Sequence, residues 1–273
     1  MIKKRPKSLV LFGNGINCEK ETYFAHKVAG FYPDLVYVNE LLEKPNLIHK
    51  YDFITLPGGF LDGDDLGSAR AQAIKWKYQQ LKGKEGFFVD ELVKFVADGK
   101  LILGICNGFQ LLVKCGLLPR LDENHKDQVA TLTFNDSGRF ENRWVYLKVN
   151  KNSPCVFLQD LDRLYLPIRH GEGKFISINE KVLARIREEN HIALQYTDKE
   201  GKVTQDYPYN PNGSQEAIAG ICDKIGRICG LMPHPEAYFE KLHHPRWTRE
   251  EIEGEPDGLK IFKNAYSYCT ENL

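Results

Sequence analysis

The chain has 273 residues, enough to bury the core of one large α/β domain, and we expect a single domain over residues 1–273. Its 37 Lys and Arg balance its 37 Asp and Glu, and this zero formal charge disfavours binding to nucleic acid or to an anionic membrane. No apolar stretch is long enough for a transmembrane helix or a signal peptide, and the seven cysteines include no Cys-x-x-Cys pair. We therefore expect a cytoplasmic protein with reduced thiols.

Strands and helices alternate in the first part of the chain. Apolar runs predict strands at residues 8–12, 35–38, 53–56 and 101–105. Helical spacing predicts a helix over residues 19–29 and another from Asp90 to the stop signal at Gly99. This alternation, with strands that are apolar on both faces, indicates an α/β fold with a mainly parallel sheet covered on two sides.

After Gly116 the pattern changes to one typical of antiparallel strands. Residues 143–149 alternate between apolar and polar, and residues 217–232 read as a hairpin that turns near Gly226. Residues 204–214 have no periodicity and contain prolines and asparagines, so we expect a loop there. The second part should add antiparallel strands to the parallel sheet.

Cys106 follows the apolar run 101–105 and is flanked by Gly104 and Gly108. The form Gly-x-nucleophile-x-Gly, between a strand and a helix, is that of a nucleophile elbow. A thiol at a helix N-terminus meets unpaired amide groups and the positive end of the dipole, which favour the thiolate by ~1 kcal/mol. An inert core cysteine is the alternative, but the two glycines and Asn107 favour a catalytic nucleophile.

A cysteine nucleophile needs a base, and the base needs a group that orients it. Two pairs have the same spacing: His170 with Glu172, and His234 with Glu236. Proline follows His234, so His234 should be extended and Glu236 should reach its ring. We assign catalysis to His234 and Glu236 and a substrate loop to His170 and Glu172. For either pair, the alternative is a purely structural hydrogen bond. Alanine substitution at each histidine tests the choice.

Backbone amides near Cys106 could stabilise an oxyanion. The amide of Asn107 follows the nucleophile directly, and the glycine pair that ends with Gly59 could bring a second amide close, although such a pair is also common in ordinary turns. Gln110 lies one turn into the expected helix and could bind a substrate amide or face solvent. Gly171 belongs to the substrate loop between His170 and Glu172.

Three other motifs are too incomplete to predict a site. The glycines after the first strand lack the full dinucleotide-binding pattern, and the acidic run at residues 62–65 lacks the rest of a calcium loop. The histidine pair at residues 243–244 lacks zinc-site spacing with any cysteine. We therefore expect no metal site and no cofactor in this chain.

Taken together, these motifs resemble the class I glutamine amidotransferases and, among them, the glutaminase subunits of phosphoribosylformylglycinamidine synthase. The resemblance runs along nearly the whole chain and rests on the strings GINCE (15–19), LPGGF (56–60), GICNGFQ (104–110), SGRFENR (137–143), HGEG (170–173) and MPHPE (232–236). It implies a three-layer, flavodoxin-like α/β fold.

The resemblance also implies a reaction and its partners. Cys106 would attack the side-chain amide of glutamine to form a γ-glutamyl thioester, while His234 passes a proton to the departing ammonia. Ammonia would travel to a synthetase subunit that uses ATP and Mg²⁺ to convert formylglycinamide ribonucleotide to formylglycinamidine ribonucleotide in purine biosynthesis. A small accessory subunit often bridges the two, and we expect Arg139, Arg143 and Asp62 to contact a partner.

Two other functions use the same sequence features. A stand-alone cysteine hydrolase of γ-glutamyl bonds would keep the chemistry but need no synthetase. A non-enzymatic regulatory module on the same fold would be expected to lack the nucleophile or the base, and this chain has Cys106, His234 and Glu236.

Overall fold

The computed structural model describes residues 5–122 and 127–273. Its strands are β1 (Lys7–Phe12), β2 (Tyr32–Tyr37), β3 (Phe53–Leu56), β4 (Leu101–Ile105), β5 (Ala130–Thr133), β6 (Glu141–Val149), β7 (Arg163–His170), β8 (Lys174–Ser177), β9 (Ile192–Thr197), β10 (Ile218–Cys222) and β11 (Ile228–Leu231). Its α-helices are α1 (Glu19–Ala29), α2 (Val38–Glu43), α3 (Arg70–Tyr78), α4 (Phe88–Ala97), α5 (Asn107–Lys114), α6 (Glu180–Glu188) and α7 (Asp257–Asn272). Short 3-10 helices are η1 (Pro45–Lys50), η2 (Val156–Leu158), η3 (Gln215–Ala217), η4 (Pro235–Ala237) and η5 (Lys241–His243).

Nine strands form one mixed sheet in the order β2-β1-β3-β4-β11-β10-β9-β6-β7. The pairings from β2 through β11 are parallel, and those from β11 through β7 are antiparallel. β5 and β8 form a separate antiparallel pair. The predicted α/β sheet, with parallel central strands and added antiparallel ones, is confirmed.

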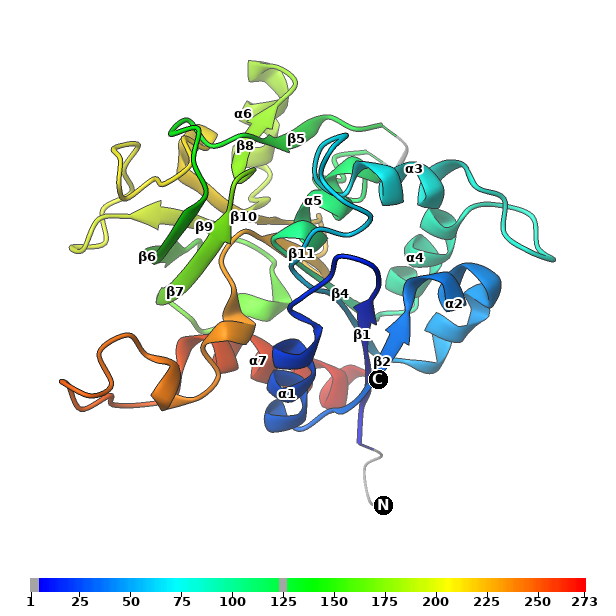
Figure 1. The fold of residues 1–273 in the computed structure, drawn as a ribbon, viewed down its shortest axis with the longest axis horizontal. Coiled ribbons are helices and arrows are strands. Elements are labelled where there is room, and N and C mark those ends of the chain that lie inside the picture. Colours follow the sequence, from blue (N-terminus) through cyan, green and yellow to red (C-terminus); the bar gives the residue numbers. More distant parts are fainter. Residues whose placement is uncertain (1–4, 123–126) are drawn as a thin grey trace.

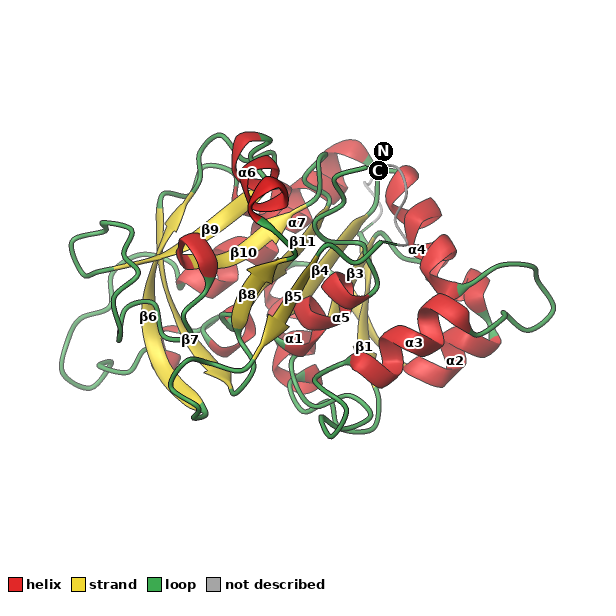
Figure 2. Cartoon of the chain, turned by 90° about the horizontal axis from the view of Figure 1, so that it is seen from above, coloured by secondary structure: helices red, strands yellow, loops and turns green. Residues whose placement is uncertain are grey.

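The helices cover both faces of the parallel half (Figures 1 and 2). α1 packs against α7, whereas α3 packs against α4 and α5. This division follows from the strand order: the chain moves one way along the sheet from β1 to β2 and the other way afterwards, and right-handed crossovers then place the connections on opposite faces. In such sheets, ligands bind beyond the carboxyl ends of the strands, near the point where the order reverses.

Local sequence signals predicted several elements well. β3 and α1 have the predicted bounds, and β10 and β11 form the predicted hairpin. β2 differs, because it begins at Tyr32, whereas the prediction began at residue 35, and because Val38 starts α2. Proline is tolerated at Pro33 because β2 is an edge strand, where a missing amide donor is not needed by a neighbour.

The predicted loop at residues 204–214 contains no helix or strand, yet its end is buried. Asn212 and Ser214 are fully buried, and both side chains reach the carbonyl of Gly173. This segment therefore supports the loop that carries His170 and Glu172. None of the described helices combines the length and apolar character needed to cross a membrane.

Candidate active site

Cys106 lies on the sharp turn between β4 and α5, with φ of 51° and ψ of −102°. A side chain at Gly108 would place its Cβ 1.9 Å from the carbonyl oxygen of Leu56, and a Cβ at Gly104 would lie 2.7 Å from the Gly108 backbone. Both glycines are therefore required sterically, because helix α5 packs directly on β3 and β4. A positive φ at a non-glycine residue costs energy, and here it presents the thiol at the carboxyl edge of the sheet.

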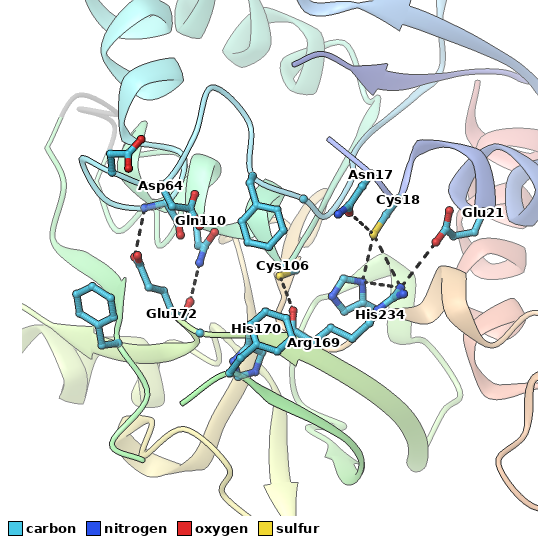
Figure 3. A pocket seen from close by; sticks show the side chains of 17 residues that line it. Asn17, Cys18, Glu21, Asp64, Cys106, Gln110, Arg169, His170, Glu172 and His234 are labelled. Carbon is cyan, nitrogen blue, oxygen red and sulfur yellow. Dashed lines mark hydrogen bonds and ion pairs between the residues drawn. The ribbon is translucent and has the colours of Figure 1, made fainter. Parts of the chain in front are cut away.

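The Cys106 thiol opens into a pocket of about 660 Å³, a size typical of small-molecule sites. The thiol is only 6% exposed, and its Sγ donates to the carbonyl of Arg169 at 3.7 Å. Figure 3 shows Cys106 between two groups of side chains, with Gln110, Glu172 and Asp64 on one side and His234, Cys18 and Arg169 on the other. A ligand in this pocket would contact both groups.

His234 and Glu236 form a buried pair beside the nucleophile. His234 has extended backbone geometry, and its Nδ1 donates to Oε1 of Glu236 at 2.5 Å. Among the described residues Nε2 has no hydrogen-bond partner, which leaves it available to the Cys106 thiol. Burial lowers the pKa of His234, but the charge of Glu236 and the nearby Cys106 thiol outweigh burial and raise the pKa well above its ordinary value. His234 therefore holds a proton next to the nucleophile.

His170 and Glu172 form no such pair. His170 Nδ1 donates to Oδ1 of Asn135 at 3.1 Å, whereas Glu172 Oε2 accepts the amide of Ser68 at 3.2 Å. Burial, helped by the charge of His234, lowers the pKa of His170 to about 3. A neutral histidine of this low basicity is a poor general base at neutral pH. The geometry thus separates two motifs that are identical in spacing.

The loop with Gly59 is tied to the loop before α1. The amide of Phe60 donates to the carbonyl of Gly15 at 2.7 Å, and the amide of Cys18 donates to that of Gly58 at 3.3 Å. Gly59 has φ of 144°, and a Cβ there would lie 2.7 Å from the Gly15 oxygen. Neither hydrogen bond uses the Gly59 amide, and Gly59 lines the pocket.

Asn107 and Gln110 connect this loop to the substrate loop. Asn107 Oδ1 accepts the amide of Leu61 at 3.3 Å, and its Nδ2 donates to Oε1 of Gln110 at 3.2 Å. Gln110 Nε2 in turn donates to the carbonyl of Glu172 at 2.6 Å. Gln110 is buried and lines the pocket, so the alternative that it faces solvent is wrong. Gly171 also lines the pocket.

Three side chains at this site were not predicted from the sequence, namely Arg169, Glu21 and Cys18. Arg169 Nη2 lies 3.4 Å from His234 Nδ1, 3.6 Å from Glu236 Oε1 and 3.9 Å from Glu21 Oε1. Cys18 Sγ lies 4.0 Å from the same His234 nitrogen. The position of Cys18 just after the first predicted strand was a usable signal, because that strand ends at the same sheet edge as β4.

Within the described ranges, Cys18, His234 and Glu236 are the group whose geometry could hold a metal ion, with ligand atoms within 4.8 Å of one another. Sulfur, nitrogen and oxygen ligands of this kind suit Zn²⁺. The Arg169 guanidinium lies within 3.8 Å of an atom of each residue, so a cationic group is already in contact with this cluster. The donor set thus serves an arginine here, and a metal would have to displace it.

The three residues expected to contact a partner differ in their availability. Asp62 pairs with Lys75 at 2.7 Å, and Arg143 contacts Glu141 and donates to the Tyr207 hydroxyl at 2.7 Å. Arg139 is exposed beside the pocket residue Phe140. All three contacts with a partner stay predictions.

Comparison with known proteins agrees with this geometry. The model of the CobB/CobQ-like glutamine amidotransferase domain matches residues 5–269. The PurQ subunit of phosphoribosylformylglycinamidine synthase from Dehalococcoides mccartyi is 46% identical over 265 residues, which cover 97% of this chain and 98% of that subunit. The phosphoribosylformylglycinamidine synthase of Dictyostelium discoideum is 33% identical over 98% of this chain, which spans 20% of that longer protein.

Among solved structures, a chain of PurLQS from Thermotoga maritima superposes with a TM-score of 0.69 at 31% identity. The alignment covers 97% of this chain and 99% of that one. The resemblance inferred from the sequence is confirmed. The chain belongs to the CobB/CobQ-like glutamine amidotransferases and, within them, to the PurQ subunits of phosphoribosylformylglycinamidine synthase.

Proposed function

We propose that this chain is the glutaminase subunit of phosphoribosylformylglycinamidine synthase, folded as one domain over residues 1–273. The observation that carries the proposal is the buried Cys106 thiol on its elbow beside the His234–Glu236 pair. Cys106 and His234 line a pocket large enough for glutamine. Cysteine, histidine and carboxylate in this order are the parts of a nucleophilic acyl-transfer site. The seven free cysteines suit a reducing, cytoplasmic location.

The first step makes and breaks one bond at the amide carbon of glutamine. The Cys106 thiolate attacks this carbon. The carbon–nitrogen bond of the amide then breaks as the His234 imidazolium donates a proton to the nitrogen, so that ammonia leaves. Glu236 stabilises the imidazolium that supplies this proton. Water then attacks the thioester, His234 accepts the proton of the water, and glutamate leaves with the thiol regenerated.

Backbone amides supply the remaining electrostatic stabilisation. We assign the stabilisation of the oxyanion to the backbone amides of Asn107 and Gly59. Loss of one such donor typically raises the activation barrier by ~3 kcal/mol. The hydrogen bond between the amide of Leu61 and Asn107 Oδ1 supports this role, because it holds the Gly59 loop against the elbow helix.

The amino-acid end of glutamine would lie on the other side of Cys106. Glu172, Asp64 and Asp65 line this side of the pocket, and their carboxyl groups suit the α-ammonium group of glutamine. Gln110 and the loop of His170 and Gly171 complete the wall. His170 Nε2 is buried without a partner among the described residues and can accept a hydrogen bond from a bound molecule.

Ammonia would pass to a synthetase. The related Thermotoga chain belongs to a PurLQS assembly, and this supports PurL and the small PurS as partners of the present chain. ATP and Mg²⁺ would bind to the synthetase, where they activate the formyl oxygen that ammonia replaces. Arg139, Arg143 and Asp62 remain our candidates for the contact surface.

Glutamate release tests this function. The full chain is assayed alone and with the synthetase assembly of the same organism, with Cys106→Ser as the inactive control. We expect the synthetase to raise the rate of glutamate release, because without its acceptor the ammonia would be lost to solution. A high rate that the synthetase does not change would instead support a stand-alone γ-glutamyl hydrolase, and no release in either assay would contradict the proposal.

A further inference from the structure

Arg169 contacts both halves of the proposed catalytic machinery through different atoms. Its backbone carbonyl accepts the Cys106 thiol at 3.7 Å. Its Nη2 lies 3.4 Å from His234 Nδ1 and 3.6 Å from Glu236 Oε1. One residue therefore contacts both the nucleophile and the base.

The guanidinium is held between two carboxylates that come from different elements. Glu236 in η4 is fully buried, whereas Glu21 in α1 is 34% exposed and lies 3.9 Å from the same Nη2. Cys18 Sγ, at 3.8 Å, and His234 Nδ1, at 3.4 Å, also face this nitrogen. In Figure 3 the guanidinium points toward Cys18, Glu21 and His234, away from Gln110 and Glu172. This position is behind the base rather than at the substrate end of the pocket.

We propose that Arg169 is a positioning residue, which orients the His234–Glu236 pair toward Cys106. This inference rests on the proposed glutaminase function and adds a residue that neither the nucleophile nor the base motif contains.

The charge of Arg169 also bears on the protonation of His234. A fixed cation with its Nη2 at 3.4 Å from Nδ1 makes the imidazolium of His234 less favourable. The other groups near His234 are Glu236 and, beyond the guanidinium, Glu21, which oppose this effect, and the side chains of Cys18 and His170. Removal of the Arg169 charge should therefore move the alkaline limb of the pH–rate profile, where His234 loses its proton, to higher pH.

Three variants and one control separate charge from shape. Arg169→Gln removes the charge, and Arg169→Lys keeps the charge but loses the planar fork. Glu21→Gln leaves the arginine charge less neutralised, so it should move the alkaline limb the opposite way. Arg163→Gln is the matched control, because Arg163 lies on the same strand and contacts the exposed carbonyl of Lys199 outside the pocket.

The profile of kcat/KM against pH is measured for each protein in the complex with its synthetase. For Arg169→Gln we expect the alkaline limb to rise by ~1 pH unit and kcat at the optimum to fall about tenfold. Arg169→Lys should recover more than half of the shift, and Glu21→Gln should lower the alkaline limb by roughly 0.3 unit because the carboxylate is partly exposed. Arg163→Gln should match the unmodified chain.

An alkaline limb that stays unchanged in Arg169→Gln would overturn the inference. So would a higher KM for glutamine with an unchanged limb and kcat, because that result would make Arg169 a substrate contact. The rate of Cys106 alkylation by iodoacetamide, mapped to its peptide, gives a readout that needs no turnover. If the unmodified chain releases no glutamate, the proposed function fails, and the alkylation rate still decides the role of Arg169, because an unchanged rate in Arg169→Gln would contradict a positioning role.

Discussion

The two His-x-Glu motifs have the same spacing and opposite environments. In the second motif, Pro235 fixes the chain so that His234 and Glu236 meet at 2.5 Å, both buried beside Cys106. In the first motif, the His170 ring packs so closely against the backbone that a Cβ on Gly173 would lie 2.3 Å from it. Nδ1 of His170 donates a hydrogen bond to Asn135.

The partner carboxylate explains the difference. Glu172 Oε2 accepts the amide of Ser68, so this carboxylate does not pair with His170. Glu236 Oε1 instead contacts Nδ1 of His234 at 2.5 Å and lies 3.6 Å from the guanidinium of Arg169. A short motif therefore predicts which groups are available, but the backbone around it decides whether they pair and which histidine can carry a proton.

The largest expected effect comes from the two histidines themselves. His234→Ala should lower kcat/KM for glutamine by roughly 10³-fold, because the leaving ammonia loses its proton donor. His170→Ala should keep kcat within about tenfold and raise KM. Steady-state glutamate release measures both, and the reverse ranking would show that the first motif supplies the base.

Substitution of Glu236 should lower kcat more than substitution of Glu172, as for the two histidines, but the difference in kcat should be smaller. Glu236→Gln keeps the size of the side chain and removes the charge that stabilises the His234 imidazolium, so we expect kcat to fall about 10²-fold. Glu172→Gln should raise KM for glutamine about tenfold and leave kcat nearly unchanged. Equal losses of kcat in both variants would remove the distinction between the motifs.

A third comparison uses stability against pH and needs no substrate. The folded-state pKa of His170 is about 3 and its ordinary value is 6.5, so the unfolded chain binds more protons between these values. Stability should therefore fall as pH decreases from 6.5 toward 3, by up to ~1.4 kcal/mol per pH unit. Urea unfolding across this range should show a shallower fall in His170→Gln.

His234 should affect the pH dependence of stability on the alkaline side rather than the acid side. Its folded-state pKa is raised, so its contribution to stability is complete below 6.5 and is lost as pH rises through the folded-state pKa. His234→Gln should remove this alkaline loss. If His234→Gln instead changed the acid slope, the two histidines would have been assigned the wrong charges.

Much of the fold followed from local signals. The apolar run before Cys106 and its two glycines predicted the elbow, because close packing of α5 on β3 leaves no room for a Cβ at Gly108. The hairpin of β10 and β11 and the extended geometry of His234 were also local properties. The start of β2 was missed because a proline in a strand is acceptable only at an edge, and edge position is a property of the whole sheet.

The missing parts of the site depend on contacts between distant segments. Arg169 and His170 are neighbours in the sequence, yet one side chain reaches His234 and the other reaches Asn135, as the alternation along a strand requires. Cys18 joins them only because β1 and β11 end at the same edge of the sheet. No motif spacing contains this information.

The central claim is that Cys106 forms the thioester and that His234 serves it. The most direct test treats the full chain with a glutamine-mimicking electrophile and locates the label by peptide mass spectrometry. We predict that the label is on Cys106, that glutamine protects it, and that labelling is slowed in His234→Ala but not in His170→Ala. A label on Cys18 or Cys115, or no label at all, would contradict the account.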